Sequence, residues 1–407
     1  MKVAVNIARV LVGILFIFSG LVKAIDPLGL AYKMQEFFEA WSNSGIMPGM
    51  MSWLNEQALL FSILMITLEV VLGVTLLLGW RKNMVSWLLL LLMLFFTFLT
   101  SYVLFSGKIR ACGCFGDCIP LTPIQTFTKD IVLLALVLLV LFGRKYINPL
   151  FSNTVSISLF LLSFFGVLGL QWYVLKHLPV KDCLPFKIGN NILELRKMPK
   201  DAVPDKYDYK FIYKKNGESK EFAVSALPDS TWEFVERKQT LIKGKNNVPL
   251  INDFVLKKPY PVYYYRLGDL ISTFEETELP DSSWTFVKKV DSSIDITNTL
   301  LSRKGQYYLL FIKDTIDIND GWKKDIETTK ELLAKKMPLA IITADYGGIT
   351  KRYEGIYTFG TKINVPVFTC DVTSIKTAGR NNVTLFLMDG PVVKNKWGGN
   401  DIEKALK

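Results

Sequence analysis

The chain has 407 residues, of which 50% are hydrophobic, and its formal net charge at pH 7 is +11. The charge comes from scattered lysines, with no basic run that alternates with aromatic residues, so the chain lacks the pattern of a nucleic-acid-binding surface. A single histidine argues against a multi-histidine metal centre and against histidine-based catalysis.

Long apolar runs occupy the first part of the chain. Because a helix needs about 20 apolar residues to cross a bilayer, the sequence predicts five transmembrane spans, at residues 3–22, 59–80, 84–105, 126–142 and 153–176. One side of these spans carries three basic pairs, Lys2 with Arg9, Arg81 with Lys82, and Arg144 with Lys145. The positive-inside rule assigns that side to the cytoplasm. We therefore expect a multi-pass inner-membrane protein with a cytoplasmic N-terminus and a periplasmic C-terminal half.

Glu69 lies near the middle of the second predicted span, where a carboxylate is costly. One interpretation is a proton relay that assists redox chemistry. The other is a structural group, either a protonated acid or a member of a buried ion pair with one of three basic residues, Arg9, Lys23 or Lys129.

Three of the five cysteines, Cys112, Cys114 and Cys118, lie within seven residues in the loop before the fourth span. Cys183 follows the fifth span, so the expected topology places all four outside the cytoplasm, where disulfides persist. Four cysteines allow three connectivities, between which the sequence alone does not choose. We favour an exchanging Cys112–Cys114 pair with Cys118–Cys183 as a structural or relay bridge.

Two other interpretations of these cysteines remain. All of them are structural disulfides, or three thiolates bind a metal together with Cys183 or His177. The C-x-C-x3-C spacing is not the usual zinc-knuckle spacing, and an oxidising compartment disfavours free thiolates. We therefore expect no metal site.

The second half of the chain has the pattern of a water-soluble α/β domain. Residues 207–214 and 221–224, on either side of Asn216-Gly217, predict a β-hairpin. In the last hundred residues, strands at 306–313, 338–343 and 366–370 alternate with a charged helix at 320–336 and a shorter helix. Strands at 383–388 and 392–397 then form a terminal hairpin, which completes an α/β sandwich pattern.

The first 145 residues resemble the DoxX/MauE group of small four-helix membrane proteins. The resemblance is carried by F-S-G-L-V-K at 18–23, by Glu69 with Gly73 and Gly79, by C-G-C-F-G at 112–116 and by T-F-T-K-D at 126–130. It implies an association with electron transfer, with thiol redox chemistry or with the maturation of disulfide-bearing periplasmic partners.

The final hundred residues resemble the thioredoxin-like fold. The active-site cysteines of that fold follow its first core strand, but no cysteine follows Phe311 until Cys370, and Val383 stands where the fold has its cis-proline. The resemblance therefore implies a redox-inert domain, with binding as its remaining role. We interpret Cys370 as a small buried core residue.

The sequence divides into a four-span membrane domain (1–145), a fifth span (146–180), a β-rich extracytoplasmic linker (181–290) and a thioredoxin-like domain (291–407). Our functional hypothesis is thiol–disulfide exchange with a periplasmic protein through Cys112 and Cys114. A quinone is one candidate electron acceptor, with a site along Phe95, Phe96, Phe98 and Tyr102. The alternative is a non-catalytic scaffold or assembly subunit of a cell-envelope complex, in which every disulfide is structural.

Overall fold

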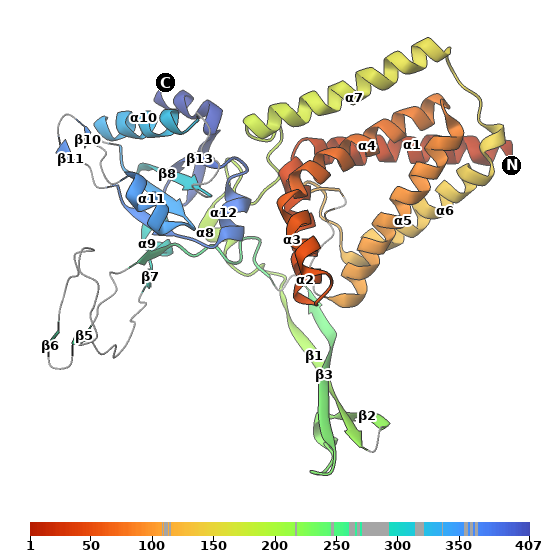
Figure 1. Cartoon of the computed structure of the whole chain (residues 1–407). Helices are drawn as coiled ribbons and strands as arrows, with labels where there is room; N and C mark the ends of the chain where they lie inside the picture. Colours follow the sequence, from red (N-terminus) through yellow and green to blue (C-terminus); the bar gives the residue numbers. More distant parts are fainter. Residues whose placement is uncertain are drawn as a thin grey trace.

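The computed structural model describes residues 1–407 apart from 108, 110–112, 114, 216–217, 246–247, 260–264, 267–268, 271–292, 314–320, 336, 354–356, 359–360 and 363–364. Figure 1 shows three parts: a helical bundle at the N-terminal end, a mixed α/β domain at the C-terminal end, and a long β-arm that projects between them.

Among the described residues, five helices are long and apolar enough to cross a membrane, as the sequence predicts. They are α1 (Lys2–Ala24), α4 (Ala58–Leu78), α5 (Lys82–Ser106), α6 (Pro123–Phe142) and α7 (Asn153–Lys176). Two shorter helices, α2 (Pro27–Asn43) and α3 (Pro48–Glu56), connect α1 to α4. The chain is therefore a multi-pass membrane protein with a helical bundle in its N-terminal part.

Local sequence signals fix several helix ends. Gly79 follows α4 with φ +68°, a left-handed conformation that glycine adopts without steric cost. At the start of α6, the Thr122 side chain accepts a hydrogen bond from the Gln125 backbone N–H, and Gln125 reaches back to the Thr122 backbone. This capping box, with Pro123 in the first turn, starts the fourth span.

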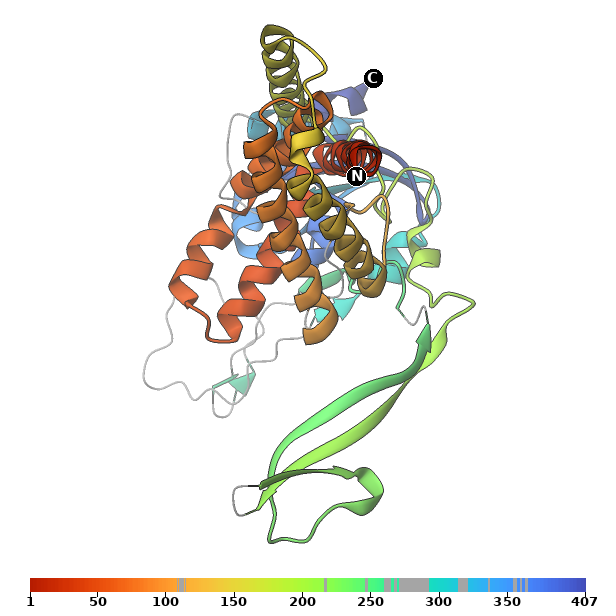
Figure 2. The same ribbon diagram turned by 90° about the vertical axis from the view of Figure 1, so that its right-hand side faces the viewer.

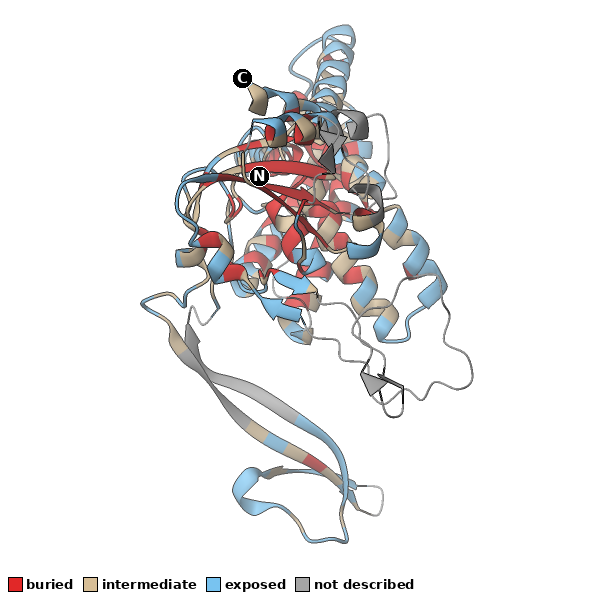
Figure 3. Ribbon diagram, turned by 90° about the vertical axis from the view of Figure 1, so that its left-hand side faces the viewer, coloured by how far each residue is buried: buried red, intermediate tan, exposed pale blue. Residues whose placement is uncertain are grey.

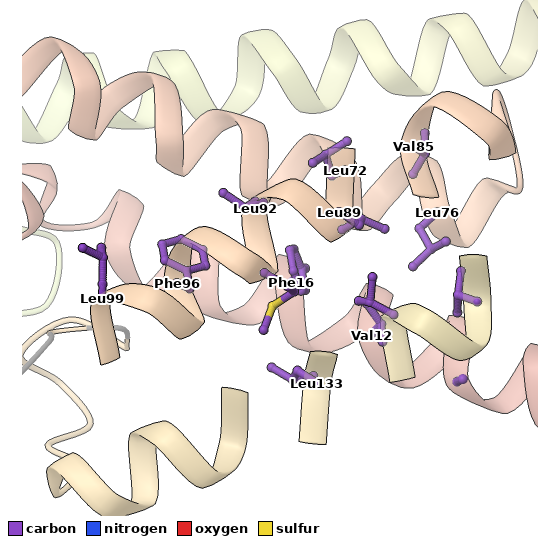
Figure 4. Close-up of a cluster of buried hydrophobic side chains, with 14 of the residues drawn as sticks. Val12, Phe16, Leu72, Leu76, Val85, Leu89, Leu92, Phe96, Leu99 and Leu133 are labelled. Carbon is purple, nitrogen blue, oxygen red and sulfur yellow. The ribbon is translucent and has the colours of Figure 1, made fainter. Parts of the chain in front are cut away.

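The interior of the bundle is an apolar cluster contributed by α1, α4, α5 and α6 (Figure 4). Val12 and Phe16 of α1 meet Leu72 and Leu76 of α4, and Leu133 of α6 packs on the same cluster. Helices α1 and α4 approach closely where they cross. A Cβ on Gly73 would lie only 2.8 Å from the Gly13 carbonyl oxygen, so this approach requires a residue without a side chain. Only four residues of α7 are buried, so this span lies on the outside of the bundle.

The C-terminal domain is built on a mixed sheet, in which the described strands follow the order β14-β13-β8-β9-β12-β4-β7. Strands β8 (Gln306–Ile312), β9 (Leu339–Thr343) and β12 (Val367–Thr369) are parallel neighbours. Strands β13 (Val383–Asp389) and β14 (Val392–Gly398) extend the β8 edge with antiparallel pairs.

Both faces of the central strands are covered, which explains their continuous apolar sequence (red in Figure 3). The associated helices are α9 (Thr297–Leu301), α10 (Gly321–Ala334), α11 (Tyr346–Tyr353), α12 (Val372–Ala378) and the terminal 3-10 helix Gly399–Leu406. One buried cluster contains Phe311 and Phe386, and a second contains Leu310 and Leu385.

Part of the segment 181–290 belongs to this domain and is more than a linker. Phe186, Ile192, Phe254 and Leu256 are buried in the same cluster as Phe311. Helix α8 (Ile192–Leu195) carries Ile192, while β4 (Lys257–Pro259) pairs with β12 on one side and with β7 (Ser293–Asp295) on the other. The core therefore combines residues from both sides of the division that we drew at residue 291.

The hairpin predicted around residue 216 is present as an arm that extends away from the rest of the molecule (Figure 2). The arm consists of β1 (Val203–Lys215), β2 (Glu218–Ala223) and β3 (Glu233–Lys245), with β1 in the centre. The turn residues 216–217 lie outside the described residues. Two further short strand pairs are β5 (Tyr265–Arg266) with β6 (Asp269–Leu270), and β10 (Tyr357–Thr358) with β11 (Thr361–Lys362).

Candidate functional site

The cysteine loop, residues 107–122, connects α5 to α6. Cys112 and Cys114, the two predicted exchanging cysteines, lie outside the described residues. Their neighbours Gly113 and Gly116 have φ +70° and +60°, and the Gly116 N–H donates to the Gly113 carbonyl oxygen over 2.8 Å. These left-handed conformations explain why glycine occupies both positions.

Cys118, at the end of the turn, forms a disulfide with Cys183, which is the pairing that we favoured from the sequence. The two Cα atoms are 4.9 Å apart and the residues are separated by 65 positions. The bond ties the cysteine loop to the segment that leaves α7, and so joins the bundle to the start of the C-terminal domain. In addition, Asp182 accepts a hydrogen bond from Lys396 Nζ over 2.7 Å.

Glu69 forms a buried ion pair with Lys23, the first of two charge pairs inside the bundle. Lys23 Nζ donates to Glu69 Oε2 over 2.5 Å, and the two residues are only 2% and 3% exposed. The Lys23 ammonium also lies 5.0 Å from the centre of the Phe96 ring. Lys23 is one of the three partners that we considered for Glu69.

The second pair joins Lys129 and Asp130 at the start of α6. Lys129 Nζ is 2.8 Å from Asp130 Oδ1, and Thr100 Oγ1 of α5 donates to the other carboxylate oxygen over 3.1 Å. The Lys129 ammonium lies 4.7 Å from the centre of the Phe115 ring, which belongs to the cysteine loop.

Both pairs line one small cavity of about 20 Å³, enough for one water molecule. Phe115 contributes to its wall, so the cysteine loop lies directly against a buried site with two carboxylates and two ammonium groups.

Arg380 attaches the C-terminal domain to the membrane domain. Its Nε donates to Asp26 over 2.8 Å and its Nη2 to Asp117, next to Cys118, over 2.5 Å. Burial acts to lower the pKa of Arg380, but the two carboxylates outweigh it and raise that pKa. Burial raises the pKa of Asp26. We nevertheless take the ionised form of Asp26 as the native one, because Arg380 and the Gly29 N–H both donate to it.

Beside this attachment is a cleft of about 610 Å³ between the two domains. Tyr32 and Lys33 of α2 form one wall, Lys376 of α12 forms another, and Cys183 lines it as well. A Cβ on Gly113 would lie 3.1 Å from Lys33 Cγ, so the cysteine loop is next to this cleft. Among the described residues of the loop, Phe115 therefore faces the buried charge pairs, and Gly113 and Asp117 face the cleft.

Three comparisons with known proteins bear on this arrangement. Residues 1–143 match the family model of methylamine utilisation protein MauE. The N-terminal part of the chain is MauE-like. Residues 207–244, in the β-arm, match a domain of unknown function, DUF8463. Protein TlpB of Flavobacterium psychrophilum is 31% identical over 170 residues, which cover 38% of this chain and 43% of TlpB. No solved structure matches the chain significantly.

Four charged residues of this site were not predicted from the sequence. Asp26, Asp117 and Asp130 belong to the MauE-like part, and Arg380 belongs to the C-terminal domain. Charged residues are costly inside an apolar span, so the Lys-Asp pair in the first turns of α6 could have been predicted from the sequence as part of a site. No local pattern points to Arg380, because its partners are more than two hundred residues away in the sequence.

The aromatic residues that we proposed for a quinone form two groups, Phe95 with Phe96, whose ring centroids are 6.0 Å apart, and Phe98 with Tyr102. Phe98 and Tyr102 pack against Trp41 of α2, whereas Phe96 faces Lys23. Phe95 is 39% exposed on the outside of the bundle. Among the described residues, no group of three or more His, Cys, Asp or Glu side chains is placed to hold a metal ion.

Cys370 is expected to resist alkylation in the folded protein. Its side chain is buried in the sheet core, and burial raises the pKa of its thiol from about 9 to about 12. A thiol whose pKa lies this far above pH 8 stays almost entirely protonated, and the protonated thiol is not the nucleophile. Iodoacetamide labelling followed by peptide mass spectrometry should therefore modify Cys370 only after denaturation. Equal labelling of the native and the denatured chain would contradict its burial.

Proposed function

We propose that this chain is an inner-membrane thiol–disulfide exchange protein in which Cys112 and Cys114 of the cysteine loop are the exchanging pair. The observation that carries the proposal concerns two described residues of the same loop: Phe115 lines the cavity of the buried charge pairs, and Asp117 lines the interdomain cleft. Its N-terminus is cytoplasmic and its C-terminal domain periplasmic in this proposal, because Arg81-Lys82 and Arg144-Lys145 lie in two connections at the same end of the bundle.

The exchange step conserves atoms and electrons. A thiolate of a periplasmic partner attacks the Cys112–Cys114 disulfide, which forms a mixed disulfide and frees one loop thiol. The second thiol of the partner then displaces the loop, so that the partner becomes a disulfide and the loop a dithiol. Glu69, held by Lys23, is the proposed proton carrier for the loop thiols.

The C-terminal domain has a docking role in this proposal. A thioredoxin-like fold is supported by the parallel strands β8, β9 and β12 with the antiparallel hairpin β13–β14. No cysteine occurs in the sequence after β8 until Cys370, so the domain itself does not exchange disulfides. We propose that a periplasmic protein segment binds in the 610 Å³ cleft, between α2 and α12, beside the cysteine loop.

A redox titration of the full chain tests the proposal. In mild thiol buffer, Cys112 and Cys114 should become alkylatable while Cys118 and Cys183 stay oxidised. A Cys114→Ala strain should then accumulate a mixed disulfide between Cys112 and a periplasmic protein, and a Cys370→Ala strain serves as the matched control. If Cys112 and Cys114 remain oxidised until the protein unfolds, the exchange function is wrong.

That negative result would favour the second candidate, a non-catalytic scaffold subunit. The specific observation behind it is the Cys118–Cys183 bond, which joins the bundle to the C-terminal domain and serves a structural purpose without any exchange.

A further inference from the structure

Helix α3 and the turn before it expose an apolar surface at one end of the bundle. Ile46, Met47, Met50 and Trp53 are between 43% and 61% exposed. The sequence from residue 44 to residue 55 carries no charged side chain. Several large apolar side chains together on an uncharged surface mark contact with a lipid bilayer or with another protein.

The residues of α3 divide into an apolar side and a polar side. Met50 and Trp53 are three residues apart, so they share one side of the helix. The opposite side carries Ser52, Asn55 and Glu56, which line a pocket of about 340 Å³ against α2. A helix with this division is suited to lie in a membrane surface, with its apolar side toward the acyl chains.

The position of α3 fits that role. Figures 1 and 2 show α2 and α3 at the end of the bundle where α4 begins, and both helices run across the direction of the spanning helix α1. With nine residues, α3 is too short to cross a bilayer, which takes about 20 residues. Its direction therefore follows the membrane surface.

The apolar side of α3 continues the lipid-facing surface of α4. Leu60, Leu64 and Leu68 are exposed and spaced by four residues, so they form one stripe along this spanning helix. The Trp53 ring contacts the ring of Phe61, beside that stripe, edge to face, with 6.2 Å between the ring centres. The exposed side of α3 thus begins where lipid already surrounds α4.

We infer that α3 is an interfacial helix whose exposed side, Met50 and Trp53 with the preceding Ile46 and Met47, inserts into the lipid leaflet at this end of the bundle. Tryptophan is enriched at this depth of a membrane. A second copy of the chain fits less well, because a stable protein interface takes about 20–30 residues from each partner. The apolar side of α2 is not available for lipid, since Leu30 is among its residues buried in the chain.

This lipid contact supports one wall of the interdomain cleft. The Asn55 carbonyl oxygen of α3 accepts a hydrogen bond from Gln35 Nε2 of α2 over 3.3 Å. Gln35 Oε1 accepts in turn from Lys376 Nζ of α12, also over 3.3 Å. The inserted helix therefore braces α2 against the C-terminal domain. The inference goes beyond the proposed exchange function and does not depend on the cysteine loop.

Spin labels on the two sides of α3 test the inference. Met50→Cys and Ser52→Cys are made in the full chain that carries Cys112→Ala/Cys114→Ala, labelled and reconstituted in phospholipid nanodiscs. Oxygen concentrates among acyl chains, whereas a nickel chelate stays in water. The ratio of oxygen to nickel collisions should be several-fold higher at position 50 than at the matched control position 52. It should approach the ratio at Leu64→Cys, on the lipid-facing stripe of α4.

A second measurement needs no substitution. The parent chain in nanodiscs that contain a phospholipid with a photoreactive acyl chain should be labelled on the peptide 46–54 as well as on α4. Equal collision ratios at positions 50 and 52, or a peptide 46–54 without label, would show that α3 lies in water and overturn the inference.

Other occupants of this surface give a different result. If the label at position 50 is inaccessible to both oxygen and the nickel chelate, and two labelled chains in one nanodisc show dipolar coupling, a second copy covers α3 and the inference is wrong. If the label is inaccessible without such coupling, part of the same chain covers it, which also overturns the inference. The redox titration of Cys112 and Cys114 in the parent chain is a separate measurement, so failure of one proposal is distinguishable from failure of the other.

Discussion

Replacing Lys23 by methionine is expected to destabilise the bundle by about 3–5 kcal/mol, because it leaves the Glu69 carboxylate buried without its partner. Both residues are almost completely inaccessible to bulk solvent, so the remaining carboxylate loses its partner without regaining full hydration. The contact of Lys23 with the Phe96 ring is lost as well. Unfolding of the purified chain in mixed detergent micelles, followed by circular dichroism, measures the change.

Two further variants identify the cause. The double variant Lys23→Met/Glu69→Met should recover most of the stability, because well-packed apolar residues often replace a buried ion pair at little cost. Lys33→Met removes the lysine of a more exposed pair with Glu36 and should cost about 1 kcal/mol or less. If Lys23→Met and Lys33→Met have equal effects, the Lys23–Glu69 pair is not buried as described.

The same variants separate structure from chemistry. If the double variant folds but Cys112 and Cys114 exchange disulfides more slowly than in the parent chain, Glu69 has a role beyond the ion pair. If both folding and exchange return to the parent level, Glu69 is structural only. This is the choice that the sequence left open.

The membrane part was the most predictable from sequence, because a long apolar run has few alternatives to a transmembrane helix. The predicted spans coincide with α1, α4, α5, α6 and α7 to within a few residues at each end. The differences lie at capping residues, such as Thr122 before α6, where the helix starts earlier than the apolar run.

Side-chain partners were less predictable, since they depend on how the helices rotate and pack. The sequence left Arg9, Lys23 and Lys129 as candidate partners for Glu69. Arg9 instead donates through Nε to the Leu76 carbonyl over 2.9 Å, near the C-terminal end of α4, where a cation is favourable. Lys129 is held by Asp130. Only the packing of α1 against α4 leaves Lys23 facing Glu69.

The C-terminal half was predictable strand by strand but not in its long-range pairing. The sequence located β8, β9, β13 and β14, because their apolar patterns are local. It did not show that Phe186 and Phe254 pack in the same cluster as Phe311. Nothing in the pattern of residues 181–290 reveals this, because strand β4 has only three residues and its partners are distant in the sequence.

Removing the Cys118–Cys183 disulfide by the double variant Cys118→Ala/Cys183→Ala is expected to cost roughly 4 kcal/mol of unfolding free energy. The bond closes a loop of 65 residues, and loop-closure entropy in the unfolded chain predicts that magnitude. The double variant is needed because a single variant leaves one thiol free to pair with Cys112 or Cys114. Thermal unfolding of the oxidised full chain measures the change.

The matched control is Cys112→Ala/Cys114→Ala, which keeps the long bridge and should unfold close to the parent chain. Non-reducing peptide mapping of this control should recover the fragments around Cys118 and Cys183 as one crosslinked species. The contacts of Arg380 with Asp26 and Asp117 remain in both variants, so the domains should stay attached in the folded state. An unchanged unfolding temperature without Cys118 and Cys183, or an alkylated Cys183 peptide from protein never exposed to reductant, would show that this bond does not hold the two domains together.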